Sequence, residues 1–277
     1  MATGPAGELR TRVLGAWDAL LALAAEHDRL GPLADLGSWP ERPVLQRLLA
    51  QAGGGPGDGS GDGAPQPRLD HGGDGREAIR ASLAEARDRV AAALEQTAAR
   101  PGLALTELDS ALGPLPLLTQ IHAMGHELAL AALRLPAAGE PALPGPLADA
   151  GVAALVDVVG ALAHRQGLRA RAAVWGPGTT GWQFQADEDG WTTSPCTLTP
   201  PPGVPGIEGP AAVVLSVPVG RSALPALLTR GDLRLHRIGG LMALAPLVEQ
   251  VPGLPGGALL RRAVGVVGLL GRLPGVR

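Results

Sequence analysis

The stretch TQIHAMGHELALAAL, residues 119–133, places two histidines one helical turn apart among alanine and leucine. His122 and His126 are four residues apart, so both imidazoles lie on the same face of a helix. That face is otherwise apolar or small, and its other members are Leu115, Leu118, Gly125, Ala129 and Leu133. An apolar stripe of this kind faces the core of a helical protein. The histidine pair is therefore predicted to point into a bundle of helices.

The first half of the chain shows helical periodicity in four segments. Apolar residues recur every three or four positions, which predicts helices over residues 8–29, 42–52, 75–97 and 116–135. The glycine-rich segment GGGPGDGSGDGAPQP, residues 53–67, has almost nothing to pack and is predicted to be a surface loop. Four helices with one apolar stripe each predict a four-helix bundle.

The second half of the chain changes period after a proline-rich linker at residues 136–146. We therefore predict an α+β protein with a helical bundle over residues 1–138 and an α+β domain over 145–277. Asp189-Gly190 is a hairpin-turn signal. The remaining predictions are helices at 147–166, 222–228 and 240–251, a proline-rich loop at 195–206, and strands in RARAAVW, GWQFQADEDGWTTS, AAVVLSVPV and DLRLHRI.

Composition excludes several classes of function. The chain has 23 basic and 26 acidic residues, for a net charge of -3, which is unlike a nucleic-acid-binding protein. Cys196 is the only cysteine, so no internal disulfide forms and a reducing compartment is expected. No signal peptide or membrane span is predicted, because charged residues or prolines interrupt every apolar run. We expect a cytoplasmic protein whose partner is a small-molecule substrate.

Two interpretations of the histidine pair are open at this stage. A buried polar group without a partner costs about 1 to 3 kcal/mol, so both imidazoles need hydrogen bonds or a metal ion. A catalytic divalent metal needs about three protein ligands, and the candidates for the third are His27 and Gln51. Glu127 points about 100 degrees away along the helix and is not counted. The remaining histidines are predicted to be ordinary surface or sheet residues, namely His71, His164 and His236.

Several segments resemble the mycothiol-dependent maleylpyruvate isomerase family, which joins a DinB-type metal-binding four-helix bundle to a sterol-carrier-like domain. The first is the tryptophan-led second helix, SWPERPVLQRLLAQAGG at residues 38–54, and the second is IHAMGHELALA on the fourth. GWQFQADEDGWTTS and RGDLRLHRIGGLMALAPLV look like elements of the family's C-terminal domain. The resemblance implies a divalent ion such as zinc and a mycothiol-type thiol cosubstrate.

The resemblance also implies roles for particular residues. His122, His126 and Gln51 match the metal ligands, although the family more often has a histidine where this chain has Gln51, and an amide oxygen is a weaker ligand for zinc. The ion would lower the pKa of the thiol, whose thiolate then adds to an unsaturated acid or is transferred. Arg230 is expected to steer an acidic substrate, with Arg221 as the second choice. Cys196 is expected to be incidental, because the cosubstrate supplies the thiol.

Three functions are compatible with these patterns. The first is a metal- and thiol-dependent isomerase or transferase. The second is a non-catalytic relative that has lost its metal and acts as a small-molecule or lipid-like binding module. The third is association with a membrane surface or a partner through ALLRRAVGVVGLLGRL, residues 258–273, although a helix packed on its own domain is the simpler interpretation. The sequence leaves open whether the protein is an enzyme.

Overall fold

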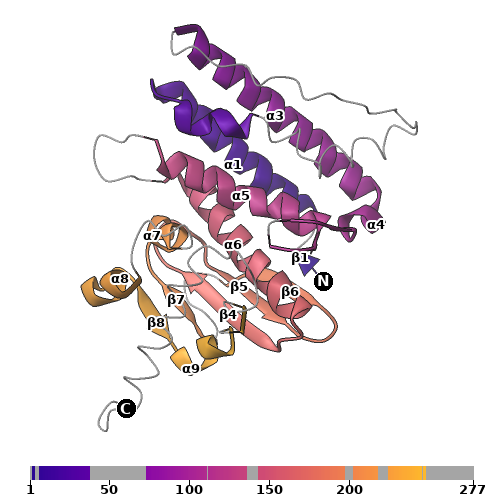
Figure 1. Cartoon of the computed structure of the whole chain (residues 1–277), viewed down its shortest axis with the longest axis vertical. Coiled ribbons are helices and arrows are strands. Elements are labelled where there is room, and N and C mark those ends of the chain that lie inside the picture. Colours follow the sequence, from indigo (N-terminus) through magenta and orange to yellow (C-terminus); the bar gives the residue numbers. More distant parts are fainter. Residues whose placement is uncertain are drawn as a thin grey trace.

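The structure is a computed structural model in which helices pack together above a sheet (Figure 1). It describes residues 2–3, 6–37, 73–110, 112–135, 143–196, 202–217, 224–244 and 246–247. Several predictions lie outside these residues: the helix at 42–52 with Gln51, the loop at 53–67 with its neighbour His71, the alternative Arg221, and the segment 258–273.

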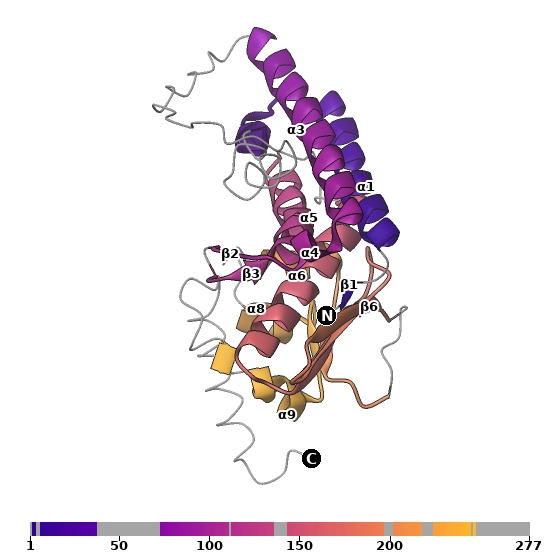
Figure 2. The ribbon, with the colours of Figure 1, turned by 90° about the vertical axis from the view of Figure 1, so that its right-hand side faces the viewer.

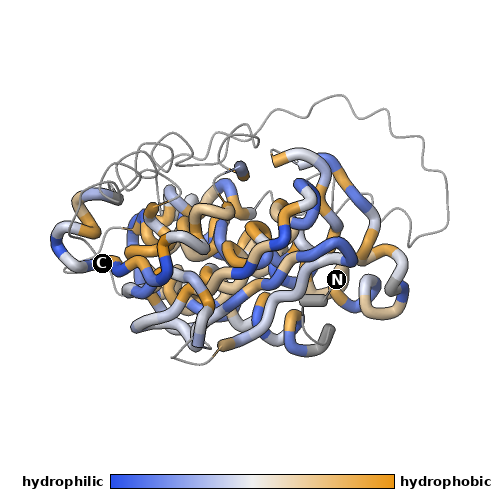
Figure 3. The backbone as a smooth tube through the Cα atoms, turned by 90° about the horizontal axis from the view of Figure 1, so that it is seen from below, coloured by the Kyte–Doolittle hydropathy of each residue, from blue (hydrophilic) through white to orange (hydrophobic). Residues whose placement is uncertain are grey.

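The helical part contains three of the predicted helices. They are α1 (Ala6–Glu26), α3 (Gly73–Ala99) and α5 (Leu117–Leu133), with a 3-10 helix at Gly31–Leu36 and a short α4 at Pro101–Ala104. Each helix buries residues spaced three and four apart, as in the stripe of α1: Leu9, Val13, Ala16, Trp17, Leu20 and Ala24. Figure 3 shows the resulting alternation of hydrophobic and hydrophilic positions along the backbone. The predicted helices at 8–29, 75–97 and 116–135 are confirmed.

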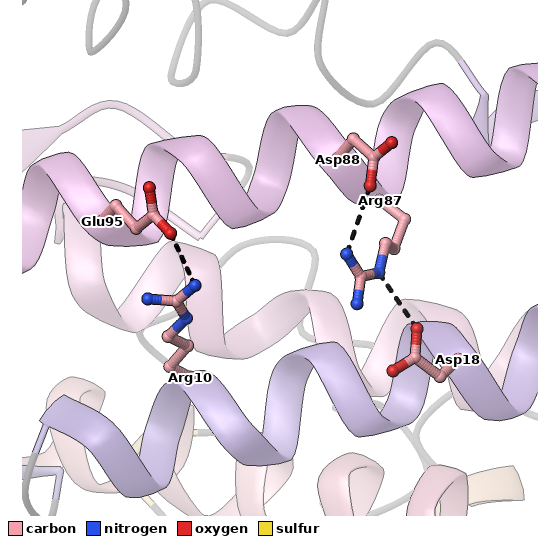
Figure 4. A network of polar contacts seen from close by, with 5 residues as sticks. All are labelled: Arg10, Asp18, Arg87, Asp88 and Glu95. Carbon is pink, nitrogen blue, oxygen red and sulfur yellow. Dashed lines mark hydrogen bonds and ion pairs between the residues drawn. The ribbon is translucent and has the colours of Figure 1, made fainter.

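Polar contacts join α1 to α3 on the outer side of the helical part (Figure 4). Arg10 lies 2.6 Å from Glu95, and Arg87 bridges Asp18 at 3.0 Å and Asp88 at 3.2 Å. Arg87 is partly buried and the other four side chains are exposed, so each pair contributes at most about 1 kcal/mol. The apolar stripes between the two helices therefore provide most of the stability.

Helix α6 (Gly145–Arg165) connects the helical part to the sheet, because it packs on α1 and α5 on one side and on the sheet on the other. Its contact with α5 is close: a Cβ added at Gly125 would lie 2.8 Å from the carbonyl oxygen of Ala150. By length and composition alone α6 is apolar enough to cross a membrane, yet 72% of its most apolar window is buried within the protein. It acts here as a core helix.

The sheet is mixed and six-stranded, in the order β1-β6-β5-β4-β7-β8. The β1–β6 and β4–β7 pairs are parallel and the others antiparallel. The first residues of the chain thus lie at the edge of a sheet otherwise built from the second half (Figure 2). The strand bounds are β1 Ala2–Thr3, β4 Ala170–Trp175, β5 Trp182–Ala186, β6 Trp191–Pro195, β7 Gly206–Glu208 and β8 Arg234–His236. A separate two-stranded ladder pairs β2 (Glu107–Leu108) with β3 (Leu115–Pro116).

The hairpin predicted around Asp189-Gly190 is confirmed. β5 and β6 pair antiparallel from Trp182 opposite Pro195 to Ala186 opposite Trp191. The turn is closed by the backbone N–H of Asp187, which donates to the carbonyl of Gly190 at 2.9 Å. This register places Trp182, Trp191 and Thr193 on the face of the sheet that α6 covers, as their hydrogen bonds to α6 show.

The segment AAVVLSVPV was predicted to be a strand, and this prediction is wrong: Ala211–Ser216 form helix α7. A short apolar run is compatible with a buried strand and with a buried helix. Here the first helical turn forms, because the carbonyl of Pro210 accepts hydrogen bonds from the backbone N–H groups of Val213 and Val214. The predicted loop at 195–206 includes two strand residues, Pro195 in β6 and Gly206 in β7. The later predictions agree in type with α8 (Leu224–Arg230), β8, α9 (Ile238–Leu241) and a 3-10 turn at Met242–Leu244.

Candidate functional site

His122 lies at the centre of a polar cluster where the helical part meets the sheet. Its side chain is 1% exposed. Nε2 lies 3.2 Å from Nη1 of Arg12 on α1, and Nδ1 lies 3.2 Å from Oδ2 of Asp157 on α6. The second contact has an ion-pair distance but falls outside hydrogen-bond geometry, so the Nδ1 and Oδ2 atoms have no hydrogen-bond partner among the described residues.

Asp157 is a carboxylate without any exposed surface. Its other oxygen, Oδ1, accepts hydrogen bonds from the indole Nε1 of Trp191 at 3.1 Å and the hydroxyl of Thr193 at 2.7 Å, both on β6. Burial alone would raise the pKa of Asp157, but the neighbouring His122 and the bonds from Thr193 and Trp191 outweigh burial and keep its pKa below the ordinary value. Asp157 is therefore negatively charged inside the protein.

The contact with Arg12 fixes the role of one ring nitrogen of His122. A guanidinium group can only donate hydrogen bonds, so Nε2 of His122 accepts. Nδ1, across the ring, faces Oδ2 of Asp157. The three side chains form a row in which a guanidinium, an imidazole and a carboxylate follow one another. This resembles the histidine and aspartate of a hydrolase triad, except that a guanidinium takes the place of the nucleophile.

A second carboxylate of α6 holds the sheet beside this row. Oδ1 of Asp149 accepts from the backbone N–H of Thr180 at 2.8 Å, from the hydroxyls of Thr179 and Thr180 at 3.0 and 2.8 Å, and from Nε1 of Trp182 at 3.0 Å. The guanidinium carbon of Arg12 lies 4.0 Å from the centre of the Trp182 ring, a cation-π distance. Arg12 thus contacts both α5 and the sheet.

The charge of Arg12 is partly compensated by its surroundings. Burial lowers the pKa of Arg12, while the carboxylates of Asp149, Glu8 and Asp157 act in the opposite direction. An arginine keeps its proton at neutral pH in any protein environment. The cluster therefore contains one permanent cation facing carboxylates from α1 and α6.

His126 lies one turn after His122 on α5 and is bonded differently. Its Nε2 atom is buried and has no hydrogen-bond partner among the described residues. Burial lowers the pKa of His126 from 6.5 to about 4, and the nearby Glu127 opposes this effect. His126 is thus neutral at physiological pH. Thr119, on the same side of the helix, has a buried hydroxyl that likewise has no partner among these residues.

The two histidines were predicted to share a metal ion, and the geometry of His122 does not fit that role. A metal ligand needs a free lone pair on nitrogen. Nε2 directs its lone pair to Arg12, and Nδ1 lies 3.2 Å from Oδ2 of Asp157, so both nitrogens of His122 already face a polar side chain. Within the described ranges no group of three or more histidine, cysteine, aspartate or glutamate side chains is arranged to hold a metal. Gln51, the third predicted ligand, lies outside those ranges.

Two other predicted site residues lie apart from this cluster. His27 comes 15 residues after Arg12, at the end of α1, which places it about 20 Å along the helix from the residue that contacts His122. Its Nδ1 atom bonds to the carbonyl of Leu23 at 2.9 Å. Arg230 ends α8, is largely exposed and pairs with Asp232 at 2.8 Å. The guanidinium of Arg230, which was expected to steer an acidic substrate, therefore already pairs with the carboxylate of Asp232.

The partners of His122 were missed by sequence reasoning. Asp157 interrupts an apolar run, GVAALVDVVGALA, and a lone charge in a core helix is a signal for a buried hydrogen-bonded carboxylate. Arg12 gave no such signal, because arginines are common on the exposed faces of helices. Neither residue could be assigned to His122 without the packing of α1 and α6 on α5.

Comparison of the chain with protein-family models, with curated proteins and with solved structures gave no match. The polar cluster and the arrangement of α5, α6 and the sheet are therefore the observations from which function is inferred.

Proposed function

We propose that this protein is a metal-independent binding protein, built on the plan of the maleylpyruvate isomerase family that its sequence resembles. One observation carries the proposal: the guanidinium of Arg12 contacts Nε2 of His122, so the lone pair of that nitrogen is not free to bind a metal. The histidine then has a structural role, because it joins α1 to α6 through Asp157. In this proposal the chain is not an enzyme.

The ligand in this proposal is apolar and binds to the α+β part. Along β4, Val174 belongs to the core under α6, so its neighbours Ala173 and Trp175 face the other side of the sheet. They form a small apolar cluster with Cys196 and Val204. These four residues are distinct from the main core but only 1 to 7% exposed, so in this proposal a small-molecule or lipid-like ligand has to displace part of the chain that covers them.

Metal content tests the first half of the proposal. Protein purified without added metal should contain far less than one equivalent of zinc, cobalt, nickel or iron by mass spectrometry. Calorimetric titration with zinc should show no saturable site, and a chelator should leave the melting temperature unchanged. One equivalent of zinc that is lost in a His126→Ala variant would overturn the proposal and favour the thiol-dependent isomerase or transferase instead.

Displacement of a fluorescent fatty acid tests the second half. We expect saturable binding that oleate competes away, and Trp175→Ala should weaken it about tenfold or more, since an aromatic contact surface of this size is worth roughly 1 to 3 kcal/mol. Leu105→Ala is the matched control, because Leu105 is an exposed apolar residue of the helical part. Equal affinity in both variants, or no binding by the intact protein, would contradict an apolar site at this cluster.

A further inference from the structure

We infer that residues 234–240 form a strap that covers Trp175 and opens to admit the apolar ligand, and that the contact between His236 and Glu208 holds the strap closed. The inference rests on the proposed function and goes beyond it, because it names the segment that must move. A movement is required, since every member of the apolar cluster that contains Trp175 is only 1 to 7% exposed.

The strap begins at the edge strand β8 and lies over the face of the sheet that carries Trp175 (Figure 1). The register pairs Trp175 on β4 with Glu208 on β7, and Gly206 on β7 with His236 on β8. The centres of the His236 and Trp175 rings are 4.9 Å apart. Gly206 leaves room for this contact, because a Cβ there would lie 2.3 Å from the Trp175 ring. The ring of His236 therefore covers that of Trp175.

A polar contact ties the middle of the strap to β7. One oxygen of the Glu208 carboxylate accepts a hydrogen bond from Nε2 of His236 at 2.8 Å, and the other lies 3.9 Å from Nη1 of Arg234. The side chains of His236 and Glu208 are 43% and 35% exposed, so water can replace this contact when the strap opens. A partly exposed contact of this kind is weak enough to break and form again.

The strap is anchored at both ends and packs lightly between them. Leu233 before it and Leu247 after it are buried in the core under α6. None of the residues from 234 to 240 is buried. Arg237, between β8 and α9, has a φ of 52°, a left-handed conformation that is unfavourable for any residue other than glycine. A segment with few buried apolar contacts opens locally while the rest of the fold stays intact.

Hydrogen exchange tests the opening without any ligand. The hydrogen-bonded amides of β8 should exchange faster than those of β5 and β6, and low urea should leave their rate unchanged, because a local opening exposes little surface. Glu208→Ala should speed this exchange about fivefold. Glu188→Ala removes an exposed ion pair with Arg169 and is the matched control, which should leave the rate unchanged. Exchange of β8 at the rate of β5 and β6 would overturn the inference.

Ligand affinity separates a moving strap from a fixed structural contact. A ligand that binds only the open form gains apparent affinity by the same factor as the open population. Glu208→Ala should therefore bind Nile red about fivefold more tightly than the unmodified protein, whereas Glu188→Ala should not. Nile red is the probe because it is uncharged, so the lost charge of Glu208 does not itself change its binding. Equal or weaker binding by Glu208→Ala would overturn the inference.

A cross-link fixes the strap in place. Glu208 and Arg234 are opposite each other in antiparallel strands, where the Cα atoms lie about 4.5 or 5.5 Å apart, within the range of a disulfide. Glu208→Cys combined with Arg234→Cys, in a Cys196→Ala background, should bind Nile red when reduced and at least about tenfold more weakly when oxidised. Gln185→Cys with Thr192→Cys joins β5 to β6 instead and should bind equally in both states.

The outcomes distinguish this inference from the proposed function. Equal binding by the oxidised and reduced forms of the β7–β8 cross-link would overturn the strap and leave the proposed function intact. No binding of Nile red or of the fluorescent fatty acid by the unmodified protein would overturn both. If the cross-linked variant does not fold, the exchange rates and affinities of Glu208→Ala and Glu188→Ala decide the question.

Discussion

Protonation of His126 should make the folded protein sensitive to mild acid. Burial holds the pKa of His126 at about 4, whereas the unfolded chain has the ordinary value of 6.5. Between these two pH values the unfolded state binds more protons than the folded state, so stability falls as the pH falls. The contribution is fully present above about pH 6.5, and no further loss occurs below about pH 4.

The magnitude follows from the size of the pKa difference. A pKa difference of between 2 and 3 units corresponds to about 3 kcal/mol of unfolding free energy. Because the loss begins near pH 6.5, about 2 kcal/mol of it should be gone between pH 7 and pH 5. That is a large share of the stability of an ordinary domain, which is about 5 to 15 kcal/mol.

Urea unfolding followed by tryptophan fluorescence at pH 7, 6 and 5 measures this effect. His126→Gln and His126→Leu both remove the titrating ring, and both should lose about 2 kcal/mol of the pH dependence even if their absolute stabilities differ. Histidine proton NMR provides a direct check, since the His126 resonance should not shift above about pH 5. A resonance that titrates near pH 6.5, or variants with the pH dependence of the unmodified protein, would refute the reasoning.

Two further predictions concern packing and charge around α6. Asp157→Ala should lower the unfolding free energy by about 3 to 5 kcal/mol, because it leaves the buried donors of Trp191 and Thr193 without an acceptor and removes a carboxylate facing His122 and Arg12. Asp18→Ala on the surface should cost less than about 1 kcal/mol. Equal losses in chemical denaturation would contradict a buried polar cluster at Asp157. Gly125→Ala should destabilise by about 1 to 3 kcal/mol, because the new Cβ meets the backbone of α6 at 2.8 Å. Gly15→Ala meets nothing within 4 Å and should be neutral or stabilising by up to about 1 kcal/mol, so a loss at Gly15 as large as at Gly125 would show that the close contact with α6 does not set the effect.

Much of the fold follows from local patterns. The periodicity of the apolar residues predicted α1, α3, α5 and α6, and Asp189-Gly190 predicted the β5–β6 hairpin, because these signals act between residues close in the chain. The helix at 211–216 was predicted as a strand, because a short run of apolar residues fits both the helical and the strand period. The pairing of β1 with β6 was not predicted, because a strand of two residues is too short to show a periodic pattern.

The sequence by itself determined that His122 and His126 share the buried face of one helix, since the spacing of four residues and the neighbouring alanines and leucines permit little else. What the two rings do was decided by the tertiary structure. Arg12, 110 residues away in the chain, and Asp157 on the next helix reach His122 only when α1 and α6 pack on α5. Whether a ring nitrogen carries a proton, accepts a hydrogen bond or binds a metal depends on the charges beside it. Only the packing of the helices brings those charges together.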